Sequence, residues 1–325
     1  MNQNILVTGG AGYLGSILVG RLLQEKDNTV DVLDCLVYGC GGLVNYLENS
    51  RFRLIRGTIL DREHLKSLLK NHYDCVIHLA SLVGEPLCAS YPKVAMEVNV
   101  QGTKNLLEAC KKAERPPFFL FSSTCSTYGV SKGYAEESSV QNPVGVYGES
   151  KVLAEKEVMR YPNHVIFRNA TLYGLSARMR LDIIPNQWVR DATLGRDLEV
   201  FEPEGLRPFI HIQDCAEYFA KCIESSRNVK RKQVFNIGEC NTTKRALALV
   251  IQEYFPDIEI KIVEKGDKRS YSVDFIKAKE EFGYFPKINL YDGIKKLKED
   301  ISCIDLDNPI YDNLKGFKDE YFRKN

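Results

Sequence analysis

The stretch Asn4-Ile-Leu-Val-Thr-Gly-Gly-Ala-Gly-Tyr-Leu-Gly-Ser16 decides the fold of this chain. Its apolar run, residues 5–7, predicts a buried parallel strand, and the apolar residues between Leu14 and Leu22 recur at helical spacing. Three glycines separate the two elements: Gly9, Gly12 and Gly15. A glycine-rich turn before a helix lets backbone N–H groups approach a pyrophosphate, where the aligned peptide dipoles favour negative charge. The stretch therefore predicts a dinucleotide-binding turn, and the alternative is a tight turn with a structural role alone.

An acidic residue ends the next predicted strand. Asp34 follows Val30-Asp-Val-Leu33, nineteen residues after Gly15. At this place a carboxylate can accept hydrogen bonds from the hydroxyls of the adenosine ribose. A 2′-phosphate would be repelled by Asp34, and no arginine follows in Cys35-Leu-Val-Tyr38 to compensate. The pattern therefore predicts NAD rather than NADP as the cofactor.

Length and composition favour a soluble protein over several other classes. A chain of 325 residues can bury a large core as one composite unit of two lobes. Its 44 basic and 43 acidic residues nearly cancel, so we expect no nucleic-acid partner and no anionic membrane surface as a partner. Met1 runs almost directly into the first strand without a signal peptide, and no window of eighteen apolar residues exists, which favours a cytoplasmic protein. The ten cysteines form no close CxxC pair, so we expect reduced thiols and no metal site.

Strands and helices alternate along the first half of the chain. Strand-like runs at 53–55, 75–79, 118–121 and 165–167 are separated by helical patterns, including helices at 62–71 and 92–110. This alternation predicts an α/β fold with a Rossmann-type, doubly wound parallel sheet. We expect residues 1–174 to form the NAD-binding domain, to which later segments return.

The pattern changes to shorter pieces from about residue 175. Helices are predicted near 182–195, 214–225 and 243–255, with strands near 198–201 and 208–212. Residues 175–325 are therefore expected to form mainly a smaller α/β lobe that binds the substrate. The tail after about residue 303 alternates acids with aromatics, and no structure is predicted for it.

Small and hydroxyl-bearing residues follow two of the predicted strands. In an open parallel sheet the ligand lies beyond the carboxyl ends of the strands. His78-Leu-Ala-Ser81 would let the backbone lie against a cofactor, or would serve strand-end packing alone. Ser122-Ser-Thr-Cys-Ser-Thr-Tyr-Gly129 has more hydroxyls than a turn needs, and Thr124 can hydrogen-bond a substrate oxygen; the alternative is a polar loop.

Tyr147-Gly-Glu-Ser-Lys151 favours a catalytic interpretation of that hydroxyl run. Tyr147 and Lys151 lie one turn apart on one face of a predicted helix, which would bring the ammonium near the phenol oxygen. A neighbouring cation stabilises a phenolate and lowers the pKa of the phenol from about 10. Tyr147 could then accept a proton from a substrate hydroxyl while a hydride passes to NAD, and in reverse protonate a carbonyl, with Thr124 holding the oxygen.

With these motifs, the chain resembles an extended short-chain dehydrogenase/reductase of the NAD-dependent epimerase/dehydratase family, of the UDP-glucose 4-epimerase type, over residues 3–300. The motifs that match are the turn at 8–15, HLAS at 78–81, the segments 99–103 and 122–129, Tyr147 with Lys151, and the segments 168–174 and 207–214. The resemblance implies a homodimer that acts on a nucleotide-diphosphate sugar in carbohydrate biosynthesis.

The resemblance also assigns roles to individual residues of this chain. It implies a catalytic set of Thr124, Tyr147 and Lys151. Around NAD it implies Gly9, Gly12, Tyr13, Leu14, Gly15, Asp34, Cys35, Thr58, Ile59, Leu79, Ala80, Ser81, Asn99, Ser122, Tyr147, Lys151 and Asn169. Around the substrate it implies Val83, Thr124, Cys125, Tyr147, Arg178, Arg180, Asn186, Arg207 and Arg269. For the arginines the alternative is surface salt bridging, and Thr58 replaces the family's usual acid at the adenine.

Departures from the family narrow the reaction. The 4,6-dehydratases of the family have Asp-Glu after the catalytic Thr, where this chain has Cys125 and Ser126. Enzymes that epimerise at C3 and C5 have a cysteine at the position of Ser126. What remains is hydride transfer at one carbon, expected to be C4 by family analogy, as 4-epimerisation, net oxidation or net ketone reduction.

The loop at 173–182 is a second departure, because it resembles a branch that oxidises nucleotide-linked heptoses at C4. Arg178 and Arg180 of this loop could grip phosphate or an acidic co-substrate, or could belong to a solvated loop. Cys88 and Cys125 could line the pocket or serve as small packing residues. A protein that senses NAD without turnover is the competing class, and the presence of both Tyr147 and Lys151 argues against it.

Overall fold

The computed structural model describes residues 3–226, 228–264 and 269–320. Its largest sheet has seven strands in the order β11-β7-β5-β4-β1-β2-β3, and every neighbouring pair is parallel. The strands are β1 (Asn4–Thr8), β2 (Thr29–Asp34), β3 (Phe52–Arg56), β4 (Cys75–His78), β5 (Phe118–Thr124), β7 (His164–Asn169) and β11 (Gln233–Ile237). The predicted Rossmann-type fold is confirmed.

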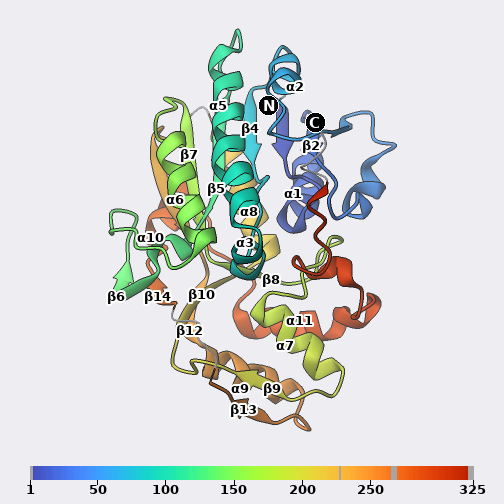
Figure 1. The fold of residues 1–325 in the computed structure, drawn as a ribbon, viewed down its shortest axis with the longest axis vertical. Helices are drawn as coiled ribbons and strands as arrows, with labels where there is room; N and C mark the ends of the chain where they lie inside the picture. Colours follow the sequence, from blue (N-terminus) through green and yellow to red (C-terminus); the bar gives the residue numbers. More distant parts are fainter. Residues whose placement is uncertain (1–2, 227, 265–268, 321–325) are drawn as a thin grey trace.

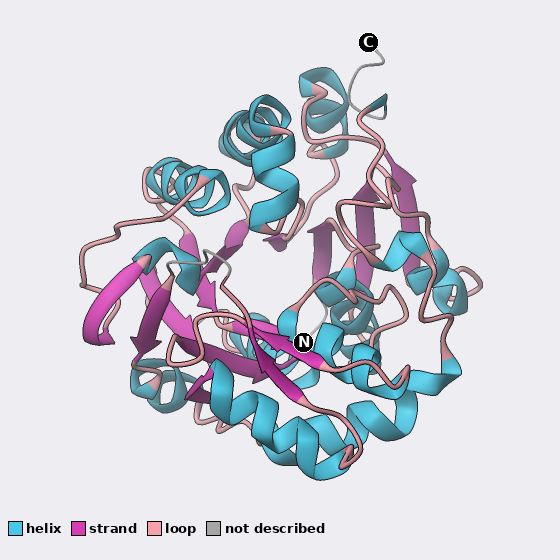
Figure 2. Cartoon of the chain, turned by 60° about the horizontal axis from the view of Figure 1, so that its bottom comes forward, coloured by secondary structure: helices cyan, strands magenta, loops and turns pink. Residues whose placement is uncertain are grey.

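Alternation of side chains along the strands explains why helices cover both faces of this sheet (Figure 2). Ile5 and Val7 pack into one hydrophobic cluster, and Leu6 between them packs into the other. The first cluster includes apolar residues of α1 (Tyr13–Gln24) and α8 (Ile212–Glu224). The second includes those of α2 (Arg62–Leu68), α5 (Thr103–Lys112) and α6 (Val146–Val158).

The helix predicted at 92–110 is divided. After α3 (Glu85–Ser90) come α4 (Pro92–Met96), a π-helical stretch Glu97–Gly102, and then α5. A π-helical turn inserts an extra residue per turn and often marks a functional region. The periodicity of apolar residues did not reveal it. Likewise α2 ends at Leu68, three residues before the predicted end.

Smaller sheets and a group of helices come mostly from the later half of the chain. The sheets pair β12 (Cys240–Thr243) and β8 (Thr171–Tyr173) with β10 (Leu206–His211), β9 (Leu198–Val200) with β13 (Ile260–Ile262), and β6 (Val130–Ala135) with β14 (Ser270–Val273). The helices are α7 (Ile184–Thr193), α9 (Lys244–Tyr254), α10 (Ile276–Phe282) and α11 (Leu290–Asp300). Of these elements, α7, α9, α11, β9 and β13 lie at the bottom of Figure 1. Strand β11 returns from this half of the chain to the edge of the large sheet.

The C-terminal tail has defined structure up to residue 320, although no structure was predicted for it. After α11 the described part of the tail runs back toward the large sheet (Figure 1). It contains a 3₁₀ turn, Pro309–Tyr311, and two buried side chains, Asn313 and Phe317. The ring centroid of Phe317 lies 4.8 Å from that of Tyr91, a residue more than 200 positions earlier in the chain. Such contacts between distant segments leave no periodic pattern in the tail itself.

Three features of the described residues concern membrane spans, disulfides and metal sites. Among the described residues, no helix is both long and apolar enough to cross a bilayer. All ten cysteines lie in described segments and are free thiols, six of them buried. Within those same segments, no group of three or more His, Cys, Asp or Glu residues is arranged to hold a metal ion.

Candidate active site

A cavity of about 360 Å³ lies at the carboxyl ends of the parallel strands, within the roughly 300–1,000 Å³ usual for small-molecule sites. It opens beside β1, because the strand order reverses between β1 and its neighbour β4. Predicted site residues that line it are Gly9, Gly12, Tyr13, Leu14, Gly15, Asp34, Cys35, Thr58, Ile59, Leu79, Ala80, Ser81, Val83, Ser122, Thr124, Tyr147, Asn169, Arg178, Arg180, Arg207 and Arg269. Four others lie behind its lining: Asn99, Cys125, Lys151 and Asn186.

The turn at the start of α1 has the geometry that a diphosphate requires. Gly9 has φ +75°, and a Cβ there would lie 2.6 Å from the backbone nitrogen of Ala80. A Cβ on Gly15 would lie 2.5 Å from the carbonyl oxygen of Gly9. The N-cap of α1 is Gly12, which offers no side-chain cap, so the helix N-terminus is open to an anionic ligand on the cavity side. These residues fit a bound dinucleotide.

Asp34 lies at the other side of this turn, at the end of β2. Its carboxylate accepts hydrogen bonds from the N–H groups of Ala11 (3.0 Å) and Leu36 (2.8 Å) and also lines the cavity. Burial raises the pKa of Asp34, while the two N–H groups and the charge of Arg178 lower it. The carboxylate is thus fixed in place as an acceptor for ribose hydroxyls.

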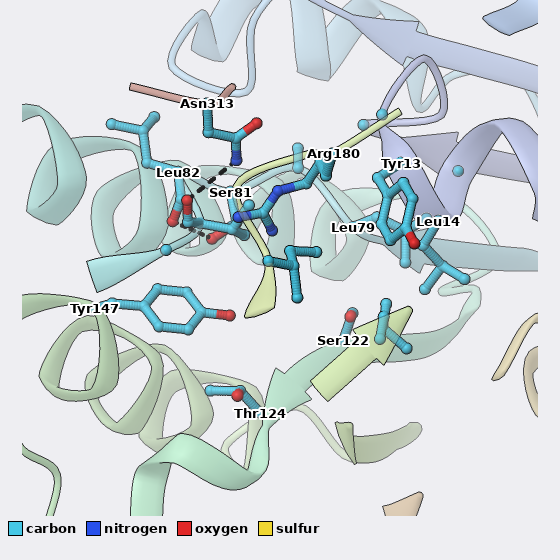
Figure 3. Close-up of a pocket in the computed structure, with 18 of the residues that line it drawn as sticks. Tyr13, Leu14, Leu79, Ser81, Leu82, Ser122, Thr124, Tyr147, Arg180 and Asn313 are labelled. Atoms are coloured by element: carbon cyan, nitrogen blue, oxygen red, sulfur yellow. Dashed lines mark hydrogen bonds between the residues drawn. The ribbon is translucent and has the colours of Figure 1, made fainter. Parts of the chain in front are cut away.

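Tyr147 and Thr124 point into the same part of the cavity from different elements (Figure 3). Tyr147 lies in the first turn of α6, and Thr124 is the last residue of β5. Burial raises the pKa of the Tyr147 phenol, and Cys88 adds to the rise; the charge of Arg180 and the hydroxyl of Thr124 lower it. The phenol is therefore protonated at neutral pH before any ligand adds positive charge.

Lys151 contacts a backbone carbonyl next to this pair. Its ammonium donates to the carbonyl oxygen of Ser122 (2.6 Å) and lies 4.3 Å from the ring centroid of Phe121. Burial lowers the pKa of Lys151 to about 7, against a smaller rise caused by Glu155. The cation that lowers the pKa of Tyr147 is Arg180, from a loop that helical spacing could not relate to α6.

Asn99, in the π-helical stretch, fixes the loop after β4. Its Oδ1 accepts from the N–H of Leu82 (2.7 Å) and from the Ser81 hydroxyl (2.8 Å), and its Nδ2 donates to the Ser150 hydroxyl (2.9 Å). In this structure Asn99 therefore holds the cavity lining from behind.

Asn186 and Cys125 are also buried behind the lining. Asn186 donates to the phenol oxygen of Tyr13 (3.0 Å) and to the carbonyl of Arg180 (2.8 Å), and accepts from the N–H of Gly174 (3.0 Å). Asn186 therefore joins the start of α1 to the loop that carries Arg178 and Arg180. The thiol of Cys125 is fully buried and donates to the carbonyl of Arg168 (3.1 Å).

A buried ion pair fixes the elements that present Tyr147 and Thr124. Arg168 on β7 lies 2.8 Å from Glu155 on α6, and the two side chains are 3% and 0% exposed. Ser123 on β5 donates to the same carboxylate, as does Gln141 (2.8 Å). Arg168 also donates to the Tyr128 phenol (2.8 Å). Strands β5 and β7 and helix α6 are thereby joined to one another, and β5 and α6 carry Thr124 and Tyr147.

The sequence interpretation missed several side chains that line the cavity: Tyr38, Glu85, Asp182, Tyr271 and Asn313. Glu85 accepts from the N–H of Tyr147 (3.2 Å); burial raises its pKa and Arg269 lowers it. Asp182 pairs with Arg180 (2.6 Å). Only Glu85 had a sequence signal, as an acid four residues after the HLAS strand end.

Two arginines and a tyrosine that contact one another also line the cavity: Arg207, Arg269 and Tyr271. Arg207 on β10 is 4% exposed, and its guanidinium lies 5.4 Å from the ring centroid of Tyr271. It also donates to the carbonyl of Arg269. The Tyr271 hydroxyl lies 3.1 Å from that of Ser126. Two guanidinium groups therefore lie close together on the cavity lining beside Tyr271.

Comparisons with known proteins agree on the family of the chain. The model of the NAD dependent epimerase/dehydratase family matches residues 5–238. The chain is 31% identical to UDP-glucuronic acid decarboxylase 6 of Arabidopsis thaliana, over 92% of this chain and 89% of that one. It is 29% identical to the uncharacterized UDP-glucose epimerase YtcB of Bacillus subtilis, over 90% and 96%. The crystal structure of UDP-glucuronic acid 4-epimerase from Bacillus cereus, in complex with UDP-glucuronic acid and NAD, superposes with a TM-score of 0.83 at 27% identity, over 92% and 99%.

Proposed function

The chain belongs to the NAD-dependent epimerase/dehydratase family, and we propose that it transfers a hydride at one carbon, C4, of a nucleotide-diphosphate sugar. Its cofactor is NAD. The proposal rests above all on one observation: Tyr147 and Thr124 point into the cavity that the glycine turn and Asp34 also line. A phenol that can move a proton and a hydroxyl that can hold the substrate oxygen therefore face the place where the dinucleotide and a second ligand would meet.

Tyr147 is proposed to move the proton that accompanies hydride transfer. Bound NAD supplies the hydride acceptor, and its reduced form the hydride donor. Because burial keeps the Tyr147 phenol protonated, it can donate that proton to a ketone oxygen. Arg180 lowers the pKa of the phenol and so eases the reverse step, in which Tyr147 takes a proton from a hydroxyl. The hydroxyl of Thr124 would hold the substrate oxygen in line.

Lys151 is proposed to assist from behind Tyr147. Its pKa of about 7 allows the side chain to change protonation state near neutral pH. The bond from Lys151 to the carbonyl of Ser122 links it to the strand end beside Thr124. Its predicted role as the cation that acidifies Tyr147 stays a prediction, whereas the charge of Arg180 already acts on the phenol.

The residues after Thr124 support hydride transfer without elimination of water. Cys125 and Ser126 stand where an acid pair would be needed, and neither carries a carboxylate. Cys125 is also fully buried, and the hydroxyl of Ser126 lies beside that of Tyr271. Glu85 is an acid on the cavity lining, but one of its oxygens already accepts the N–H of Tyr147. We therefore propose that a 4,6-dehydratase reaction is disfavoured.

Arg207 and Arg269 are proposed to bind the diphosphate of the sugar nucleotide. Both line the cavity, and a planar guanidinium can donate two parallel hydrogen bonds to phosphate oxygens. The nucleotide-sugar relatives support this class of substrate. Asn186, predicted at the nucleotide, would act instead through Tyr13 and Arg180.

A panel of UDP-, GDP-, CDP- and dTDP-sugars tests the proposal. The purified protein is incubated with each compound and NAD, absorbance of reduced nicotinamide is followed, and the sugar is identified by NMR. A 4-epimerase inverts the sugar without accumulating NADH, whereas a net 4-dehydrogenase accumulates one NADH per product. A net ketoreductase consumes NADH when supplied with 4-keto sugars. Absence of turnover across the panel would contradict the proposal and favour a protein that senses NAD.

A homodimer through α6 is proposed on separate grounds. Two large apolar side chains on this helix, Leu153 and Met159 at its C-cap, are exposed by 40% and 44%. Burying them against a second copy would remove apolar surface from water. Light scattering after size-exclusion chromatography should give twice the mass of the chain, and Leu153→Glu should shift it toward the monomer.

A further inference from the structure

Arg178 is a buried cation on the cavity lining that lacks an acidic partner. It lies on the loop after β8 and is 5% exposed. Its neighbour Arg180 is paired with Asp182 at 2.6 Å, but no carboxylate of the described segments pairs with Arg178 in this way. Its Nε is buried without a hydrogen-bond partner. A buried charge that is left uncompensated is costly, so its presence here calls for an explanation.

Neighbouring side chains hold the guanidinium of Arg178 in a fixed plane. It lies 3.9 Å from the ring centroid of Tyr38. Its Nη2 donates to Oδ1 of Asn313 (2.7 Å), and its Nη1 donates to the carbonyl of Met179 (3.2 Å). The Tyr38 hydroxyl in turn donates to the backbone oxygen of Asn313 (2.9 Å). A guanidinium oriented in advance loses little conformational freedom when it binds a ligand.

The charge of Arg178 is not balanced by its surroundings. Burial and the like charge of Arg180 lower the pKa of Arg178 to about 10, while Tyr38, Asp182 and Asp34 raise it. An added anion would relieve both the burial and the repulsion. The negative charge that would compensate Arg178 is therefore missing from its surroundings, and a phosphate could supply it.

The position of Arg178 identifies which phosphate is meant. Tyr38 follows Asp34 in the loop after β2, and Asp34 and Arg178 influence each other electrostatically. This is the end of the cavity predicted to receive adenosine. The other arginines, Arg207 and Arg269, belong to the end near Tyr271. Arg178 thus lies with the dinucleotide and away from the site proposed for the sugar nucleotide.

We propose that Arg178 binds the diphosphate of NAD, with its guanidinium donating to a phosphate oxygen at the adenosine end of the cavity. The contact comes from the half of the chain that follows the glycine turn by more than 160 residues, and the C-terminal tail holds it through Asn313. NAD would then be bound by backbone N–H groups on one side and by this arginine on the other. The inference does not depend on which sugar the protein uses.

Binding measurements on the full chain, stripped of nucleotide, test this contact. Calorimetry gives the Kd of ADP-ribose, NADP and adenosine for the wild type and for Arg178→Met, which keeps an apolar side chain against Tyr38. A hydrogen bond to a charged acceptor predicts that R178M weakens ADP-ribose binding by roughly 10- to 100-fold. Adenosine binding should change less than twofold. The matched control is Arg190→Met: Arg190 pairs with Asp191 (2.7 Å) and does not line the cavity, so ADP-ribose binding should stay within twofold.

Several results would overturn the assignment. ADP-ribose binding within twofold of the wild type in R178M is one, and an equal loss for ADP-ribose and adenosine is another, because it would indicate a change of shape alone. A loss confined to NADP would place the contact at a 2′-phosphate. If R178M does not fold, Arg178→Lys decides by the same comparison: it keeps the charge but not the planar donor, so ADP-ribose should bind at least fivefold more weakly while adenosine does not. Unchanged ADP-ribose affinity in R178K would then reject the proposal.

Discussion

Replacing Lys151 by Met should change how the stability of the protein depends on pH. Burial lowers the pKa of Lys151 from 10.5 to about 7 in the folded protein. Between these two values the unfolded chain holds a proton that the folded chain has released. Raising the pH through this window therefore favours the folded state of the wild type. Methionine does not titrate, so the variant lacks this gain.

The size of the effect follows from the two pKa values. Each pH unit within the window changes the free energy of unfolding by about 1.4 kcal/mol. From pH 7, where the folded side chain is half protonated, to about pH 9.5, the wild type should gain ~3 kcal/mol relative to Lys151→Met. Below pH 7 the charged ammonium is buried in the folded state, so there the variant has its largest relative advantage.

Urea unfolding of both proteins at pH 7 and about pH 9.5 measures this difference. Titrations of all other groups occur in both proteins and cancel in the comparison. A difference between the two proteins that stays constant within ~0.5 kcal/mol, well below the change expected from the shifted pKa, would refute the reasoning. A difference of opposite sign would show that the folded protein stabilises the ammonium of Lys151, for example through Glu155 and the carbonyl of Ser122.

Three further substitutions test other parts of the site. Asp34→Ala should reduce the preference for NAD over NADP by about tenfold, because a charged acceptor for the ribose is lost; an unchanged ratio of the two Kd values would contradict the ribose role. Glu155→Gln should lower the free energy of unfolding by about 3–5 kcal/mol in urea, because it leaves the charge of Arg168 buried and unpaired; a loss below about 1 kcal/mol would show that the pair is not needed. Gly15→Ala places a Cβ 2.5 Å from the Gly9 carbonyl, so the protein should be less stable by about 1–3 kcal/mol and bind NAD more weakly; full NAD affinity would show that the turn tolerates the change.

Local patterns predicted the elements on which the fold and the reaction depend. The strand, glycine turn and helix at 4–16 are contiguous, so their geometry follows from neighbouring residues alone. The acid at the end of β2 and the hydroxyl run after β5 were located in the same way, because the carboxyl ends of parallel strands meet at one edge. Tyr147 was found through its spacing from Lys151 on one helix.

Contacts between distant segments were beyond the reach of these patterns. The sequence has no arginine in 35–38, yet the charge of Arg178, more than 140 positions later, acts on the carboxylate of Asp34. Helical spacing placed Lys151 near Tyr147 but could not show that its ammonium bonds to the Ser122 carbonyl. The same limit hid Asn313, because the tail acquires its structure only by packing against residues more than 130 positions earlier.

The most direct test of the proposed chemistry is the turnover of Tyr147→Phe together with its affinity for NAD. The phenyl ring keeps the shape of the side chain and removes only the oxygen that would move the proton. We expect turnover of the sugar nucleotide identified in the panel to fall at least ~100-fold, the scale of losing an acid/base group, while NAD binds as tightly as before. Turnover equal to that of the wild type, with NAD bound, would contradict the role assigned to Tyr147.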